Sequence, residues 1–136
     1  MKLPEELERT LRAAIDRIIP ADEYPGASQS GVGEYLARQF DKDLQPLVKD
    51  YCAGLAALEA ESVTRFERSF DSLTDEEKDS LLTQIEAGKV ATTWTVPPQT
   101  FFKLLTNTTQ EGFYSEPEQG GNRDAVSWVM IGFENN

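Results

Sequence analysis

Apolar residues that recur at the spacing of an α-helix constrain the fold of this chain more than any other feature. The first segment shows the pattern with Leu3, Leu7, Leu11, Ile15, Ile18 and Ile19. Residues at this spacing lie on one face of a helix, and that face needs a core to pack against. Pro4 suits the first turn of such a helix, and Pro20 ends it. The segment therefore predicts an amphipathic helix between these two prolines.

Two further helices are predicted before residue 70. A loop over residues 21–30 contains the turn pair Pro25-Gly26, and Ser28 or Ser30 is available to cap the helix that follows. That second helix is short, and its apolar face consists of Val32, Tyr35, Leu36 and Phe40. A third helix, the longest, is expected from about Gln45 to Ser69. Its inward face consists of Leu47, Val48, Tyr51, Leu55, Leu58, Phe66 and Phe70.

The remaining third of the chain predicts two more helices. Thr74 and Glu77 have the spacing of a capping box, which opens a fourth helix that Gly88 ends. Residues 89–96 are rich in β-branched side chains and are predicted to be extended, and Pro97-Pro98 then open a fifth helix that ends near Gly112. Residues 125–133 are expected to form a short helical or extended piece. The predicted fold is all-α, a single domain over residues 1–136 with about five helices and a long irregular C-terminal loop region.

The charge balance excludes several classes of partner. The chain has 13 Lys and Arg against 24 Asp and Glu, a net charge of -11, so nucleic acid and anionic lipid surfaces would be repelled. No apolar run approaches the roughly 18 residues of a membrane span, so direct membrane insertion is not expected. The N-terminus shows neither the apolar core of a signal peptide nor a paired-arginine export motif. A negative surface also keeps a protein in solution, so charge alone identifies no partner.

Two residue types further restrict the chemistry. The chain has no histidine, the commonest general base and the usual nitrogen ligand of zinc or haem. Cys52 is the only cysteine, so no internal disulfide or thiolate metal cluster can form, and we expect a buried, inert thiol. Any catalysis would depend on carboxylates, Tyr or Lys.

Three short motifs are interpreted as structural. An acidic run lacks the alternating ligands and central glycine of a calcium loop and suits the start of a helix; it consists of Asp71, Asp75, Glu76, Glu77 and Asp79. The triplet at 107–109 matches a glycosylation sequon but falls inside a predicted helix. Gly112, Gly120 and Gly121 form no nucleotide-binding loop, because no strand precedes them.

Residues 112–124, GFYSEPEQGGNRD, break the helical pattern and are followed by Trp128. One interpretation is a sugar site, in which aromatic and polar side chains bind a polyol; its residues would be Tyr114, Arg123, Asp124 and Trp128. The other is that Asn122 and Asp124 fix a turn while Phe113, Trp128 and Phe133 pack inward. We favour the second.

Several runs together point to one family. They are IIPADEYPGAS at 18–28, Gly31-Val32, YCAGL at 51–55, EGFYSEP at 111–117, GGNRD at 120–124, Trp128 and MIGF at 130–133. In these runs, from about Leu11 to Phe133, the chain resembles the gluconate 2-dehydrogenase subunit 3 family.

The resemblance implies a small subunit that has no cofactor of its own and accompanies a large FAD-dependent dehydrogenase of the glucose-methanol-choline type. Such an enzyme oxidises sugars, sugar acids or glycosides, and its FAD and substrate pocket lie in that other chain. A cytochrome c subunit often takes the electrons, and the small subunit commonly carries a twin-arginine signal. The resemblance thus implies a periplasmic location, whereas a chain without such a signal would be cytoplasmic.

Three functions remain open at this point. The first is an accessory subunit that binds, stabilises and escorts the flavoprotein; the candidate contact residues are Tyr24, Pro25, Phe113, Tyr114, Pro117, Asn122, Arg123, Asp124 and Trp128. The second is a free-standing carbohydrate-binding protein or small carboxylate-dependent enzyme that uses Glu116, Asp124 and Tyr114. The third is an export or folding chaperone that leaves once the flavoprotein has matured.

Overall fold

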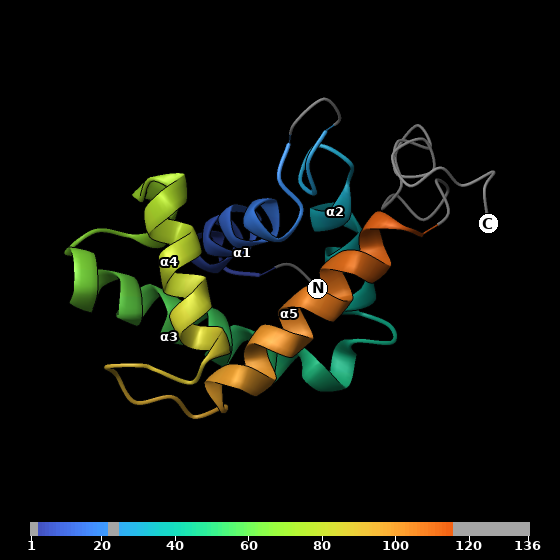
Figure 1. Ribbon diagram of the computed structural model, residues 1–136. Helices are drawn as coiled ribbons and strands as arrows, with labels where there is room; N and C mark the ends of the chain where they lie inside the picture. Colours follow the sequence, from blue (N-terminus) through green and yellow to red (C-terminus); the bar gives the residue numbers. More distant parts are fainter. Residues whose placement is uncertain (1–2, 22–24, 116–136) are drawn as a thin grey trace.

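Five α-helices and two short 3-10 turns make up the regular structure of the residues described in the computed structural model, 3–21 and 25–115 (Figure 1). The helices are α1 (Glu5–Ile18), α2 (Val32–Gln39), α3 (Val48–Phe66), α4 (Asp75–Glu86) and α5 (Pro98–Phe113). The 3-10 turns are η1 (Gln45–Leu47) and η2 (Phe70–Ser72). The all-α prediction is confirmed for these residues, and α3 is the longest of their helices, as predicted.

The ends of α1 and α4 form as the sequence indicates. Pro4 is the N-cap of α1. Ile18 is the last residue of the helix, and Ile19, its C-cap, is followed by Pro20. At the start of α4, the Thr74 hydroxyl accepts from the Glu77 backbone N–H (3.1 Å), and the Glu77 carboxylate accepts from the Thr74 N–H (2.9 Å). Gly88 follows α4 in the left-handed region (φ 77°), which only glycine adopts without strain.

Helix α5 joins the other helices to one another. It contacts α1, α2, α3 and α4, and Figure 1 shows it running across the molecule from the lower end of α4 towards α2. Its residue Phe101 meets Tyr51 of α3 edge to face, with ring centroids 6.1 Å apart, and Tyr51 meets Phe40 in the same way at 5.1 Å. Such pairs add to the stabilisation that burial of the rings provides. The core is therefore centred where α3 and α5 cross.

A fully buried carboxylate organises the connection between α4 and α5. Glu61 of α3 is 0% exposed at its side chain, and it accepts from the backbone N–H groups of Ala91 (2.9 Å) and Thr92 (2.7 Å). The Thr92 hydroxyl and the indole N–H of Trp94 also donate to it, and Arg65 Nε lies 2.8 Å from Oε2. These donors lower the pKa of Glu61 to about 2 despite its burial. The charge is thus held inside the protein by hydrogen bonds.

Several local expectations are wrong. The segment 89–96, expected to be extended, is an irregular loop that bends at residues 91–92 and 95–96 and is fixed by the Glu61 carboxylate. The third helix is shorter than 45–69, because it opens as η1 and ends at Phe66, where Glu67 takes a left-handed conformation (φ 57°). Phe70 is buried as expected, but it lies on η2.

The predicted cap of α2 is also wrong. Neither Ser28 nor Ser30 caps the helix: its N-cap is Gly31, in the left-handed region (φ 90°), with no side-chain hydrogen bond. The Ser28 backbone N–H instead donates to Asp16 on α1 (2.8 Å). Cys52 is partly rather than fully buried, and this burial raises the pKa of its thiol, which agrees with the expected inert role.

Candidate partner-binding site

The loop between α1 and α2 is built tightly onto the end of α1. The backbone N–H of Ala27 donates to the Ile19 carbonyl (3.0 Å), and the side chain of Asp16 accepts from Ser28 N–H. A Cβ at Gly26 would lie 2.8 Å from the backbone nitrogen of Ala21, so glycine permits this close return of the chain. Pro25 is half-buried at the described edge of the loop. From Pro25 towards α2, these contacts therefore hold the loop in one position on the end of α1.

The C-terminal end of α5 packs against the start of α2. A Cβ at Gly112 would lie 2.8 Å from the ring of Tyr35 and 3.2 Å from the side chain of Val32. Phe113 is 1% exposed and Tyr114 is 48% exposed, and their rings meet edge to face at 5.3 Å. Phe113 thus belongs to the core, while Tyr114 is one of the exposed large hydrophobic side chains among the described residues.

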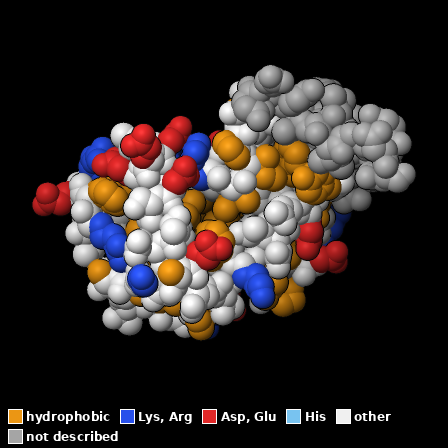
Figure 2. Space-filling model, viewed as in Figure 1, with side chains coloured by type: hydrophobic (Ala, Val, Ile, Leu, Met, Phe, Trp, Pro, Cys, Tyr) orange, Lys and Arg blue, Asp and Glu red, His pale blue; other side chains and the backbone are white. Residues whose placement is uncertain are grey.

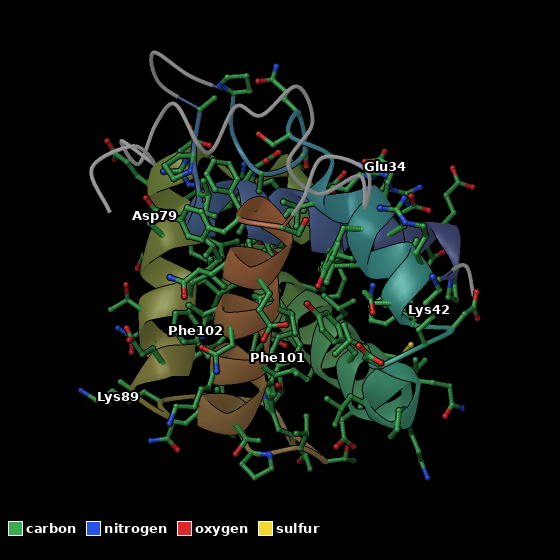
Figure 3. The ribbon with its side chains drawn as sticks, turned by 90° about the vertical axis from the view of Figure 1, so that its right-hand side faces the viewer. Glu34, Lys42, Asp79, Lys89, Phe101 and Phe102 are labelled. Atoms are coloured by element: carbon green, nitrogen blue, oxygen red, sulfur yellow. The ribbon has the colours of Figure 1, made fainter. Side chains whose placement is uncertain are left out.

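These two segments lie at the same end of the molecule. Val32 follows directly after the loop and touches Gly112, so the loop and the end of α5 meet through α2. Figures 1 and 3 both show the loop and the last turn of α5 at one end of the helical body. Figure 2 shows hydrophobic side chains gathered on the surface there. The structure therefore brings together the two regions that the sequence singled out, as far as their residues are described.

The Tyr35 hydroxyl of α2, at this end of the molecule, lies near the charged side chains of Glu111, Asp43 and Arg38. Burial raises the pKa of the Tyr35 hydroxyl, and the carboxylates of Glu111 and Asp43 raise it further against the opposing effect of Arg38. Tyr35 is therefore a neutral hydrogen-bonding group at neutral pH. An aromatic surface with a polar rim is typical of a protein interface.

Most of the predicted contact residues lie outside the described residues. Of the nine, the structure describes Pro25, Phe113 and Tyr114. The others are Tyr24, Pro117, Asn122, Arg123, Asp124 and Trp128, and Glu116 of the alternative carboxylate site is also outside. Of the alternative sugar site, Tyr114 is described, and Arg123, Asp124 and Trp128 lie outside the described residues.

The other acidic residues of interest have structural partners. Arg17 of α1 binds Asp79 through two hydrogen bonds (2.8 and 2.9 Å) and lies 3.4 Å from Asp75, which joins α1 to α4. Arg68 binds Glu77 at the start of α4. Within residues 3–21 and 25–115 no group of three or more Asp, Glu or Cys side chains is arranged to bind a metal ion. No helix in this part of the chain is both long and apolar enough to cross a bilayer.

The fold and the site define a small helical protein with an aromatic surface at one end of its bundle. Its sequence matches the family model described as gluconate 2-dehydrogenase subunit 3 over residues 5–134. The chain belongs to this family, which confirms the resemblance drawn from its motifs. The family is named for one subunit of a dehydrogenase, and the name identifies no partner chain. Comparisons with curated proteins and with solved structures gave no match.

Proposed function

We propose that this chain is the non-catalytic small subunit of an FAD-dependent sugar, sugar-acid or glycoside dehydrogenase. It binds and stabilises the large flavoprotein subunit of the glucose-methanol-choline type, which holds the FAD and the substrate. The family match over residues 5–134 carries this proposal. An escort role in export to the periplasm and a cytochrome c subunit as electron acceptor belong to the same proposal.

The described structure supports a binding role in two ways. The carboxylate with the largest shift in pKa, Glu61, is enclosed by backbone and side-chain donors, so it holds a loop in place rather than facing a substrate. The end of the molecule that carries Tyr114 instead presents an exposed aromatic ring, and the loop at Pro25 lies at the same end (Figures 1 and 3). Exposed aromatic side chains on a rigid support are typical of binding hot spots.

Co-expression tests the proposal directly. The chain, tagged for affinity purification, is produced together with an FAD-dependent dehydrogenase of the glucose-methanol-choline type from the same genome. We expect a yellow protein to co-elute at equal stoichiometry, with sugar oxidation by the complex and none by the small chain alone. A chain that binds FAD tightly or oxidises a sugar by itself would contradict the proposal. Co-elution only with immature dehydrogenase would instead favour a chaperone that leaves after maturation.

A further inference from the structure

A hollow lies along the last turns of α5, at the aromatic end of the molecule. It has a volume of about 360 Å³ and is lined by Asn107, Gln110, Glu111 and Tyr114. The last three follow Asn107 at the spacing of an α-helix, so the four side chains share one face of α5. The ring of Tyr114, 48% exposed, forms an aromatic wall of the hollow. The other side chains that line it are polar.

The lining of the hollow is rich in hydrogen-bond acceptors. Glu111 provides a carboxylate, and Asn107 and Gln110 each provide an amide oxygen. No Lys or Arg is among the described residues that line the hollow, so a second carboxylate would be repelled there. A group that combines an aromatic ring with an N–H donor fits better, because its ring packs on Tyr114 while its N–H binds an acceptor. The indole of tryptophan is such a group, since its nitrogen donates and does not accept.

The chain itself carries an indole a short distance beyond the hollow. Residues 125–133, AVSWVMIGF, contain no Asp, Glu, Lys or Arg, and seven of the nine are apolar. Trp128 lies in this run. The residues between Ser115 and Trp128 span up to about 40 Å when extended, whereas the hollow covers about 10 Å of α5. The connection is therefore long enough to bring the indole to the hollow.

The end of α5 fixes where this connection begins. The Ser115 hydroxyl donates to the Gly112 carbonyl (2.9 Å), and the Tyr114 backbone N–H donates to the Gln110 carbonyl (3.1 Å). The ring of Tyr114 rests edge to face against Phe113, which is 1% exposed and belongs to the core. The connection thus starts directly beside a fixed aromatic wall. A short linker gives a docking group an effective concentration in the millimolar range, so even a weak contact is occupied.

We propose that the hollow at the end of α5 binds the indole of Trp128 from the chain's own C-terminal segment. The ring packs on Tyr114, and the indole N–H donates to the Glu111 carboxylate. Trp128 then enlarges the aromatic surface at this end of the molecule and packs against its own chain. This docking takes place within the isolated chain, so it is independent of the proposed function.

Fluorine NMR of the full chain labelled with 5-fluorotryptophan tests the docking. The chain has two tryptophans, and Trp94→Phe and Trp128→Phe assign the two resonances. A soluble gadolinium chelate broadens the resonance of an exposed ring more than that of a covered one. Tyr114→Ala removes the aromatic wall, and Val63→Ala on α3 is the matched control, because Val63 is 51% exposed. Circular dichroism checks that both variants are folded, and Trp94, held by Glu61, is the internal reference.

We expect the chelate to broaden the Trp128 resonance at least about threefold less than that of free 5-fluorotryptophan, because Tyr114 and the helix cover the ring. Tyr114→Ala should about double the broadening of Trp128, and Val63→Ala should leave it unchanged. Broadening equal to that of the free amino acid would overturn the docking. A Trp128 ring that stays equally covered in Tyr114→Ala would overturn it too.

Other occupants of the hollow give different results. Protection of Trp128 that grows with the concentration of the chain would indicate a second copy. Protection that appears only when the large subunit is added would place Trp128 at the interface with that subunit. Either result would overturn docking within one chain and leave the proposed function standing. Failure of the large subunit to co-elute would overturn the proposed function and leave the docking standing.

Discussion

At the scale of single residues, the close crossing of α3 and α5 depends on the absence of a Cβ atom at Gly54. A Cβ at this position would overlap the ring of Phe101. The ring is 1% exposed and packs against Tyr51, so it has no space to move into. Glycine inside a helix costs about 1 kcal/mol relative to alanine. Close packing of Phe101 is what offsets this cost.

We expect Gly54→Ala to destabilise the protein by at least about 2 kcal/mol, because the overlap forces α3 and α5 apart. Urea unfolding followed by circular dichroism measures this loss. Gly33→Ala is the matched control, since its Cβ would meet the movable guanidinium end of Arg12, and it should change stability by less than about 1 kcal/mol. The further substitution Phe101→Leu should offset part of the Gly54→Ala loss. Additive losses in that double variant would contradict the overlap.

At the scale of elements, α3 and α5 are also joined by one buried pair of hydroxyl groups. Tyr51 Oη lies 2.9 Å from Thr108 Oγ1, and the Thr108 hydroxyl lies 2.7 Å from the Leu104 carbonyl. Because the Thr108 proton goes to that carbonyl, its oxygen accepts from Tyr51. Burial raises the pKa of Tyr51, so the phenol keeps its proton. The two partners therefore differ in what each loses when the other is removed.

Removal of the threonine hydroxyl should cost more than removal of the tyrosine hydroxyl. Thr108→Val leaves the buried Tyr51 hydroxyl without its partner, whereas Tyr51→Phe leaves Thr108 bonded to Leu104. An unsatisfied buried group costs about 1–3 kcal/mol, so we expect Thr108→Val to lose about 1 kcal/mol more unfolding free energy than Tyr51→Phe. The double variant should lose less than the two single losses added together. Equal single losses would show that the assigned donor is wrong.

The loop between α4 and α5 should weaken as acid protonates Glu61. The folded pKa is lowered from 4.5 to about 2, so the stabilisation is complete above about pH 4.5 and is lost as the pH falls towards 2. A shift of this size corresponds to about 3 kcal/mol. Glu61→Gln should remove most of this stabilisation at pH 7. The difference in unfolding free energy between Glu61→Gln and the parent chain should narrow below pH 4.5.

The fluorescence of Trp94, which donates to Glu61, reports on this loop in a Trp128→Phe background. Urea unfolding at a series of pH values measures the difference in unfolding free energy between Glu61→Gln and the parent chain. Glu76→Gln, at an exposed position of α4, is the control and should behave like the parent chain at every pH. A gap between Glu61→Gln and the parent that does not change from pH 7 to pH 3 would contradict a lowered pKa at Glu61.

Local signals explain which elements the sequence predicts well. The capping box at Thr74 and the glycine at 88 act within a few residues, so their pattern is visible in the chain itself. Glu61 gave no such signal, because its partners at 91–94 are about thirty residues away and only the fold brings them together. The same applies to Ser28, whose backbone N–H is bound by Asp16 across the loop.

The candidate site was predictable only in part, for the same reason. The motif around Tyr114 indicated an aromatic surface, and the structure exposes that ring. Phe113, the adjacent residue, was expected to pack inward and was also named as a candidate contact; the structure buries it in the core, which confirms the first expectation and makes the second wrong.

At the scale of the whole molecule, a few of the 24 acidic side chains bind arginine across elements. Arg17 joins α1 to Asp75 and Asp79 of α4, and Arg12 joins Glu8 to Glu34 of α2. Ion pairs at the surface stabilise only weakly. The pairs of Arg17 nevertheless lessen repulsion between α1 and α4, in which acids outnumber bases. The exposed carboxylates mainly set the net charge and with it the solubility, whereas the buried carboxylate of Glu61 holds the loop between α4 and α5.

This separation predicts that acid makes the protein insoluble before it unfolds. The isoelectric point is about 4.4, so repulsion between molecules vanishes near that pH and association is expected. Glu61, with a pKa of about 2, stays ionised there and keeps its loop bonds. Turbidity should therefore peak near pH 4.4, while circular dichroism of the dilute protein still shows full helix content. Helix content should fall only at lower pH, where the charge of Glu61 is lost. A loss of helix content that accompanies or precedes the turbidity would show that the surface acids, rather than Glu61, govern acid stability.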